Sequence, residues 1–339
     1  MNLTIALDAM GGDYGPSVIV PAAIRILAEE RSVRLILVGD EGLLGETLGA
    51  HGARLGEHLA IYHASQRVEM DEVVSLALRN KKDSSMRVAI NLVKEGVADA
   101  CVSAGNTGAL MAMARFVLKT LSGVDRPAIC TSLPSLTGHA HLLDLGANID
   151  STPTHLFQFG IMGSVLACAV DNNPRPKVGL LNVGEEEIKG NENVKEAGRL
   201  LSAANIDYIG FVEGDDIYRG VADVIVCDGF VGNVALKASE GVAKMIIHFI
   251  KQEFKGGVLS RIAGVASKSV LSRLGERVDP RRYNGASLLG LRGIVIKSHG
   301  GADVFSFTNA IKQAMAECRK NVPSLISEQL ESMLKDGAN

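Results

Sequence analysis

The chain alternates short apolar runs with longer stretches in which apolar residues recur at helical spacing. The short runs are bounded by glycine and small polar residues, which predicts strands at 4–7, 34–38, 59–63, 100–102, 128–133, 141–145, 178–181, 208–212, 224–227 and 293–296. The intervening pattern predicts helices, among them 17–28, 86–95 and 109–118. Alternating strands and helices favour parallel pairing with helices on both faces of the sheet. We therefore expect a single α/β domain over 1–339 with a doubly wound, largely parallel sheet.

Most of the predicted strands end in glycine or small polar residues just before a helix begins. In open parallel sheets, ligands bind outside the carboxyl ends of the strands. We therefore predict that these strand tips converge on one cleft.

The tip at 100–111 carries the strongest local signal. The strand breaks into Ser103, Gly105, Asn106, Thr107 and Gly108 before an apolar helix starts. Free backbone N–H groups at a helix start suit an anion or a developing oxyanion. The spacing is neither that of the dinucleotide-binding glycine motif nor that of the P-loop. Helix capping is the alternative, because Ser, Asn and Thr are also preferred caps.

The other tips supply further candidate site residues, each with an ordinary structural alternative such as capping, a solvated ion pair or burial. Asp228, Asn233 and Lys189 are candidates for the chemistry, with Asp228 orienting phosphate and Lys189 supplying charge. The candidates for substrate binding are Asp8, Gly11, Gly12, Asp13, Gly105, Gly108, Asp144, Asn148, Asn182, Gly184, Gly229, His299 and Gly300. Because carboxylates repel phosphate, we expect no proton-transfer role for Asp8 or Asp13.

The segment 255–282 departs from this alternation. Apolar residues share one helical face while basic residues lie away from it, and Leu271 falls out of phase, which predicts two short helices with a break near Ser269. We therefore predict an amphipathic helical insertion at 246–284. A basic amphipathic helix can contact anionic lipid, an acidic protein or a subunit neighbour. The residues predicted to make these contacts are Leu259, Arg261, Ile262, Val265, Lys268, Arg273 and Arg277.

Composition narrows the class of protein. The net charge is −3 and aromatic residues make up 4% with no Trp, which argues against a nucleic-acid binder. The five cysteines are far apart and show no metal-ligand spacing, so we expect no metal and reduced, buried thiols in a cytoplasmic protein. No apolar run reaches the length of a membrane-spanning helix.

Several tips belong to long motifs. They read Leu-Asp-Ala-Met-Gly-Gly-Asp-Tyr-Gly-Pro at 7–16, Ser-Ala-Gly-Asn-Thr-Gly-Ala-Leu at 103–110 and Leu-Asp-Leu-Gly-Ala-Asn at 143–148, with others at 83–88, 184–190, 227–234, 283–293 and 297–300. Together they resemble the PlsX family of phosphate acyltransferases over residues 3–325.

This resemblance implies a three-layer α/β/α fold related to phosphotransacetylases and isocitrate-type dehydrogenases. It implies transfer of a long-chain acyl group from acyl-acyl carrier protein to inorganic phosphate, giving acyl phosphate for phospholipid synthesis, without a cofactor. It also implies a cytoplasmic homodimer that attaches peripherally to the membrane, and it makes the downstream glycerol-phosphate acyltransferase a candidate partner.

The chemistry fits these residues independently of the resemblance. Phosphate is already partly a dianion at neutral pH, and a thiolate, with a thiol pKa of about 8.5, is a good leaving group. The protein then has to orient phosphate and stabilise the tetrahedral oxyanion. The alternatives are a short-chain phosphotransacetylase, which has no evident use for the 255–282 insertion, and a scaffold that holds the carrier protein at the membrane. A dehydrogenase is disfavoured because no nicotinamide-binding motif follows the first strand.

Overall fold

Within the part of the chain that the structure describes, one mixed sheet of 11 strands organises the fold. The computed structural model describes residues 3–254 and 256–336, without the side chains of 258, 259, 261, 262, 274, 278 and 333–336. The strand order is β3-β2-β1-β4-β11-β10-β5-β6-β9-β7-β8. The strands are β1 Leu3–Asp8, β2 Val33–Gly39, β3 Leu59–His63, β4 Ala100–Ser103, β5 Ala128–Ser135, β6 Gly138–Leu143, β7 Lys177–Leu181, β8 Asp207–Val212, β9 Val224–Val226, β10 Ala286–Leu289 and β11 Ile294–Lys297.

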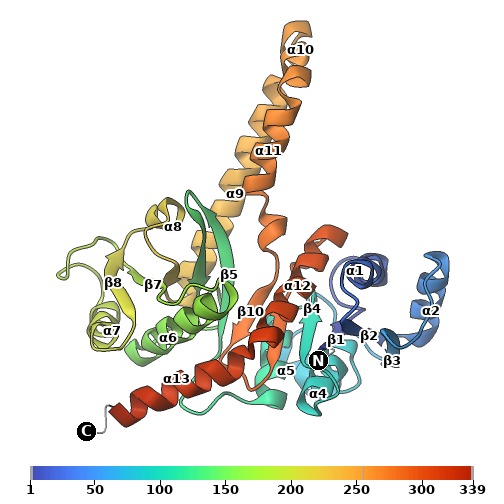
Figure 1. Cartoon of the computed structure of the whole chain (residues 1–339), viewed down its shortest axis with the longest axis horizontal. Helices are drawn as coiled ribbons and strands as arrows, with labels where there is room; N and C mark the ends of the chain where they lie inside the picture. The colour runs from blue at the N-terminus through green and yellow to red at the C-terminus, as the bar shows by residue number, and fades with distance from the viewer. Residues whose placement is uncertain (1–2, 255, 337–339) are drawn as a thin grey trace.

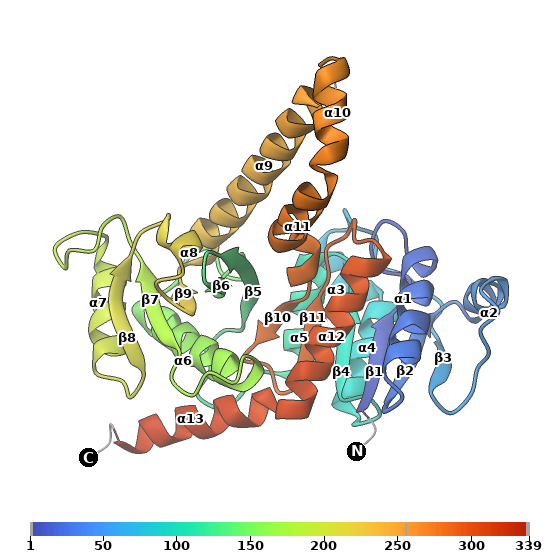
Figure 2. The same cartoon turned by 45° about the horizontal axis from the view of Figure 1, so that its top comes forward.

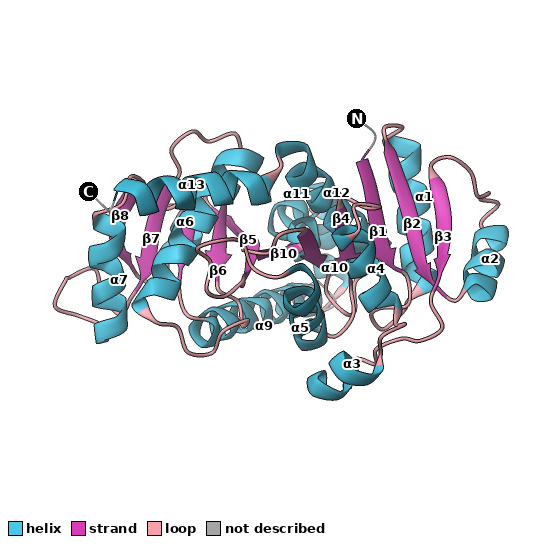
Figure 3. Cartoon of the chain, turned by 90° about the horizontal axis from the view of Figure 1, so that it is seen from below, coloured by secondary structure: helices cyan, strands magenta, loops and turns pink. Residues whose placement is uncertain are grey.

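Helices cover both faces of this sheet, and Figure 3 shows them on both sides of the row of strands. They are α1 Pro16–Glu29, α2 Glu41–Ala50, α3 Val74–Asn80, α4 Ser85–Lys94, α5 Thr107–Leu118, α6 Pro153–Val170, α7 Glu192–Ser202, α8 Asp216–Arg219, α9 Gly229–Glu253, α10 Val258–Ala266, α11 Lys268–Val278, α12 Val304–Lys320 and α13 Val322–Asp336, with a 3-10 helix η1 at Pro280–Tyr283. The α/β class and the largely parallel sheet predicted from the sequence are confirmed.

The direction of the strands divides the sheet into two parallel blocks. Strands β3, β2, β1, β4 and β11 run one way. The central strands β10 and β5 pair antiparallel with their neighbours, and β6, β9, β7 and β8 consequently run the other way. The two blocks are therefore antiparallel to each other. The convergence of the strand tips on one cleft stays a prediction.

Alternating side chains of the strands reach separate cores on the two faces. In β1, Ile5 and Leu7 pack under α1 and α12, whereas Ala6 packs under α4 and α5. This follows from the period of two in a strand. The second block has a core on each face as well, one of them built around Phe159 and Met162 of α6. The result is a three-layer arrangement that fixes both rows of strand ends.

Among the described residues, α6 is the one helix long and apolar enough to match a membrane span by length and composition. More than half of it is buried, and its apolar residues pack against β7, β9 and α13. This is the pattern of a core helix. Cys101, Cys130 and Cys227 are buried as expected, but Cys168 on α6 is exposed, so the expectation that all thiols are buried is wrong for it.

The segment after the first turns of α9 forms a helical arm that projects from the body of the molecule, together with α10 and α11 (Figures 1 and 2). The predicted break is confirmed, and it falls at Ser267, two residues earlier than expected. Val265 is 77% exposed, and Lys268, Arg273 and Arg277 are exposed as well. The side chains of Leu259, Arg261 and Ile262 lie outside the described residues.

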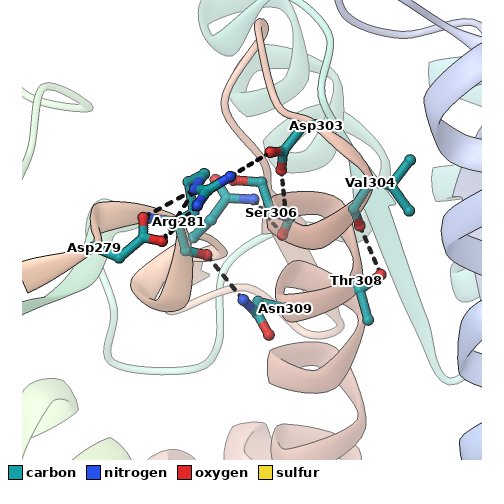
Figure 4. A network of polar contacts seen from close by, with 8 residues as sticks. Asp279, Arg281, Asp303, Val304, Ser306, Thr308 and Asn309 are labelled. Atoms are coloured by element: carbon teal, nitrogen blue, oxygen red, sulfur yellow. Dashed lines mark hydrogen bonds and ion pairs between the residues drawn. The ribbon is translucent and has the colours of Figure 1, made fainter. Parts of the chain in front are cut away.

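A polar network fixes the base of this arm to α12 (Figure 4). The Arg281 guanidinium donates to both carboxylate oxygens of Asp279 and, at 2.8 Å, to Asp303. Asp303 in turn caps α12 by accepting the Ser306 N–H at 2.8 Å. Asn309 donates to the Arg281 carbonyl at 2.9 Å. The arm therefore leaves the body from a well-anchored point.

Candidate functional site

Three neighbouring strands of the first block end at the same level. Asp8 at the end of β1 is the register partner of Ser103 at the end of β4, and Ser103 is also the partner of Lys297 at the end of β11. Because parallel strands in register project partner residues side by side, a carboxylate, a hydroxyl and an ammonium meet here. We call Asp8, Ser85, Ser103 and Lys297 the Asp8 cluster.

Asp8 is buried beneath the loops that follow the strands, with 1% of its surface exposed. Its carboxylate accepts from Ser85 Oγ at 2.5 Å and from Ser103 Oγ at 2.6 Å, and Ser103 Oγ accepts the Gly105 N–H at 3.0 Å. A Cβ at Gly11 would lie 2.6 Å from the Asp8 carboxylate and 2.9 Å from the Gly105 nitrogen. Only glycine permits this close approach. Asp8 therefore positions the serines and the loop above it.

Lys297 and Ser85 are the residues of the Asp8 cluster that the sequence pattern does not single out, and Lys297 carries the charge. Its ammonium donates to the carbonyls of Ala104, at 3.2 Å, and of Ser298, and the residue is 8% exposed. A lysine placed directly after the apolar run 293–296 was the available signal, because that position ends a buried strand. Buried lysines are uncommon and mark sites where charge is used.

Burial shifts the pKa values of Lys297 and Asp8. Desolvation lowers the pKa of Lys297 to about 8, although Asp8 and Asp13 oppose the shift and Lys237 adds to it. Desolvation also raises the pKa of Asp8, against the hydrogen bonds from Ser103 and Ser85 and the charge of Lys297. The pKa of Lys297 therefore lies close to physiological pH, as is typical of side chains that gain or lose a proton in a functional site.

The start of α5 borders the Asp8 cluster. Asn106 caps the helix by accepting the Ala109 N–H at 3.0 Å, so the capping alternative is confirmed for this residue. Its amide also donates to the carbonyls of Met70, at 2.9 Å, and Glu72, at 3.2 Å. Thr107 and Gly108 are exposed, and the first N–H groups of an α-helix have no partner within the helix. This is the part of the site that can receive an anion.

The remaining first-block candidates line the same end of the sheet. Exposed Asp13 donates its N–H to the Gly300 carbonyl at 2.9 Å, which joins the loops after β1 and β11. A Cβ at Gly12 would lie 2.8 Å from that carbonyl and 2.9 Å from the Ala104 Cβ. His299 is exposed, and its pKa is lowered by partial burial and by nearby Lys237. Gly12, Asp13, His299 and Gly300 thus surround the Asp8 cluster.

A second set of candidates lies at the end of β6 and the start of α9. Asp144 is fully buried, and its carboxylate accepts from the N–H groups of Ile129 and Ala147 and from the N–H and side-chain amide of Asn148, at 2.7–3.1 Å. Desolvation still raises its pKa. Asn148 also donates to the Pro127 carbonyl at 2.9 Å. These two side chains hold the loop and have little capacity left for a ligand.

The start of α9 packs directly on this loop. The Gly229 N–H donates to the Asn148 carbonyl at 2.8 Å, and a Cβ at Gly232 would lie 1.9 Å from the Asp144 carbonyl oxygen. Asp228 caps α9 by accepting the Val231 N–H at 2.9 Å, which confirms the capping alternative, and Asn233 is exposed. The glycines at these positions serve close packing between helix and loop.

The loop after β7 forms a third group. Asn182 donates to the carbonyls of Gly184, at 3.0 Å, and Lys189, at 3.2 Å, and so closes the loop on itself. Lys189 is exposed and pairs with Glu186 at 2.8 Å, and this partner raises its pKa. The structure therefore favours the solvated ion pair for Lys189.

Helix α9 connects the first two groups. It starts at the Asp144 loop, and two turns later Lys237 lies close enough to Lys297 and His299 to lower the pKa of both. Met111 of α5 packs both against the α4–α5 core and against the core that holds Leu145 and Ala235. The strand ends of the two blocks are thus coupled through α5 and α9.

Comparison with known proteins adds an independent finding. A family model described as "Fatty acid synthesis protein" matches residues 3–325. The chain is 62% identical over 337 residues to a phosphate acyltransferase from Nitrosococcus oceani, covering 99% of both chains. It is 63% identical over 327 residues to a phosphate acyltransferase from Methylococcus capsulatus, covering 96% of both.

Solved structures with low sequence identity share the fold. A phosphotransacetylase from Streptococcus pyogenes superposes with a TM-score of 0.66 at 18% identity over 94% of both chains. A 4-hydroxythreonine-4-phosphate dehydrogenase from Klebsiella pneumoniae gives a TM-score of 0.51 at 16% identity over 93% of this chain and 97% of that one. Because one fold hosts several activities, these likenesses speak to architecture alone.

Proposed function

Because the chain belongs to the PlsX family of phosphate acyltransferases, we propose that it transfers a long-chain acyl group from acyl-acyl carrier protein to inorganic phosphate. The products are acyl phosphate and free carrier protein, and the acyl phosphate enters phospholipid synthesis. The observation that best supports this activity is the meeting of a buried ammonium with the outward-facing start of α5 at the ends of β4 and β11.

In the proposed reaction, a phosphate oxygen attacks the thioester carbonyl carbon. A C–O bond forms, the carbonyl becomes a tetrahedral oxyanion, and the C–S bond then breaks to release the thiolate of the carrier. The phosphate dianion needs no strong base, and the thiolate needs no strong acid. The site therefore has two tasks, which are holding phosphate beside the thioester and stabilising the oxyanion.

We assign these tasks to different parts of the site. The N–H groups of Thr107 and Gly108 at the start of α5 and the ammonium of Lys297 neutralise the negative charge of phosphate and oxyanion. Asp8 and Ser103 are positioning residues, because their side chains are buried and bonded to one another. Gly12, Asp13, His299 and Gly300 form the surrounding surface on which the rest of the substrate would lie.

An activity assay with two acyl donors tests this proposal. The protein is incubated with phosphate and either palmitoyl-acyl carrier protein or acetyl-coenzyme A, and acyl phosphate is trapped with hydroxylamine. We expect hydroxamate from the carrier-protein donor. Turnover with acetyl-coenzyme A alone would instead identify a short-chain phosphotransacetylase, and turnover with neither would leave a scaffold role.

A variant distinguishes catalysis from scaffolding. Ser103→Ala removes the hydroxyl that joins Asp8 to Gly105, and we expect turnover to fall about 10²-fold, because the loop that leads into α5 loses its fixed position. A scaffold would keep its cellular role in this variant. The Asn106 and Asp228 caps are unsuitable for this purpose, because removing them costs helix stability of about 1 kcal/mol each.

We further propose that the arm mediates contacts with a second copy of the chain and with anionic lipid. Its α9 residues Val242, Met245, Ile246 and Phe249 are at least half exposed, and exposed basic residues follow on α11. An uncovered apolar surface of this kind is typical of an interaction site. The segment 246–284 would thus act as the dimer and membrane insertion of one 1–339 catalytic domain, in a cytoplasmic enzyme that binds the membrane peripherally.

Two measurements test the arm. Sedimentation should give a dimer for the parent protein and a monomer after Met245→Asp and Phe249→Asp. Vesicle flotation with anionic lipid should weaken when Val265 is changed to Asp, and a parent protein that never floats would refute the lipid contact. The carrier protein and the downstream glycerol-phosphate acyltransferase are the proposed protein partners. Chemical cross-linking through Lys268, and through lysines introduced by Arg273→Lys and Arg277→Lys, tests whether they contact the arm.

A further inference from the structure

A cluster of metal-ligating side chains lies outside the Asp8 cluster. His139 and His141 stand two apart on β6 and therefore project to the same face of the strand. Asp171, at the end of α6, faces them from the adjoining layer. His139 Nε2 lies 3.1 Å from one carboxylate oxygen of Asp171, and His141 Nε2 lies 2.7 Å from the other. We call these three residues the His-Asp cluster.

From this geometry we propose that His139, His141 and Asp171 form a binding site for a divalent transition-metal ion of the zinc class. One ligand atom from each residue lies within 4.8 Å of the other two. Bonds of about 2.1 Å in a tetrahedral site place ligand atoms about 3.4 Å apart, so small side-chain rotations are sufficient. Two imidazoles and one carboxylate are a donor set that zinc and iron sites use, with further positions left for water.

The surroundings of the His-Asp cluster are suited to holding a metal ion. Ser132 Oγ lies 3.1 Å from His141 Nδ1, and this contact orients the ring so that Nε2 points at Asp171. Metal-binding histidines are held through their second nitrogen in the same way. A polar cavity of about 180 Å³ adjoins the three residues and gives room for water ligands. His141 is almost fully buried, whereas His139 is accessible, so an ion has a path in.

The position of the cluster links it to the Asp8 cluster. Asn284 lines the same cavity, and its side chain donates to Ser298 Oγ at 2.8 Å and accepts the His299 N–H at 3.0 Å. Tyr283, at the base of the arm, has its ring centroid 6.2 Å from that of His139. A bound ion would therefore tie β6 and α6 together beside the segment that supports Lys297 and the arm. We assign it a structural role, because the cluster does not itself touch the Asp8 cluster.

Titration of untagged, chelator-treated protein with Co²⁺ and Zn²⁺ tests the site. We expect one Co²⁺ per chain with visible d–d absorption, displacement by Zn²⁺, and a rise in melting temperature on Zn²⁺ binding. His139→Gln or Asp171→Asn removes a metal ligand and should weaken metal binding by roughly 10²-fold or more. The loss should be this large because losing a residue that only orients a ligand already weakens metal affinity by about 10- to 100-fold.

Two matched control variants distinguish this site from other side chains that could bind the metal ion. Cys168→Ser removes an exposed thiol one turn from Asp171, and His51→Gln removes an exposed histidine elsewhere, so both should bind as the parent does. The proposal is overturned if the parent shows no saturable Co²⁺ spectrum, or if His139→Gln binds as tightly as the parent. A melting temperature that falls in Asp171→Asn without any metal binding would identify a hydrogen-bonded clamp instead.

Discussion

Asp8 and Asp144 occupy corresponding positions in the two blocks of the sheet, at the end of an apolar strand and before a glycine-containing loop. Both are buried, and burial raises the pKa of both. Their partners differ. Asp144 accepts only from amide N–H groups, which belong to the loop it closes. Asp8 accepts from two serine hydroxyls and lies in the field of the Lys297 ammonium.

On the proposed mechanism, this difference separates a structural carboxylate from one that supports chemistry. Amide partners do not change their protonation, so the Asp144 carboxylate holds its loop in place and the loop serves as packing for α9. Hydroxyls can reorient and an ammonium can titrate, so we expect the Asp8 cluster to respond to a bound anion. The same sequence pattern, an aspartate after an apolar strand, thus occurs in two structural settings, and the hydrogen-bond partners of the aspartate distinguish them.

The sharpest test of the comparison is Lys297→Met. We expect acyl phosphate formation to fall about 10²–10³-fold, because the cation that neutralises phosphate and oxyanion is lost. The melting temperature should hold or rise, since a buried charge is replaced by an apolar side chain of similar length. Exposed Lys94→Met is the matched control and should keep full activity. Full turnover in Lys297→Met would remove Lys297 from the mechanism.

The converse variant is Asp144→Ala. Four N–H groups then lose their acceptor, and we expect the free energy of unfolding to fall by about 3 kcal/mol. Denaturant unfolding monitored by circular dichroism measures this loss. Asp150→Ala, at an exposed position in the same connection, should change stability little. Should Asp144→Ala instead unfold like the parent but lose turnover, Asp144 would belong to the catalytic machinery.

A pH profile probes the Asp8 cluster without a mutation. With the pKa of Lys297 lowered to about 8, its ammonium is lost above that pH, and turnover should decline about tenfold per pH unit. Asp8 and Asp13 oppose this loss of the proton, and Lys237 promotes it. Lys237→Gln should therefore move the alkaline limb to higher pH. A flat profile to pH 10 would contradict the assigned role.

The same shift affects stability with a defined sign. The unfolded chain keeps the lysine protonated to about pH 10.4, so between the two pKa values the unfolded state binds more protons. Unfolding free energy should therefore rise with pH across this window in the parent, and this contribution should be absent from Lys297→Met.

The smallest effect is expected at Lys189. Its ammonium is exposed and paired with Glu186 on the surface, where solvent screens the charge. Lys189→Ala should keep turnover within about twofold of the parent, as expected for an exposed pair. A loss comparable with that of Lys297→Met would show that the loop after β7 moves onto the substrate.

Local pattern was sufficient to predict most strands and the residues at their tips. Apolar runs and turn residues located β1, β4 and β6, and capping chemistry explains Asn106 and Asp228. Strand direction was not predictable in the same way, because pairing is non-local. The apolar pattern does not predict β10, and it does not show that β5 and β6 form an antiparallel hairpin.

The role of individual side chains was predicted less well than their location. Lys297 was missed because solvent exposure is the usual state of lysine, and only its pairing beside β4 makes it buried. Lys189 is a candidate in the sequence because its ammonium could supply positive charge within a family motif, yet its partner is the neighbouring Glu186. Burial and partners arise from tertiary packing, which residue type and spacing alone do not contain.

The position of β11 has a consequence for the order of events during synthesis. β1 and β4 are complete when about a third of the chain has emerged, but their neighbour β11 is translated near the end. Until then β4 presents an unpaired edge, and Lys297 is absent from the Asp8 cluster. The first block therefore cannot mature co-translationally as a finished unit, and we expect the enzyme to become active only once nearly the whole chain has left the ribosome.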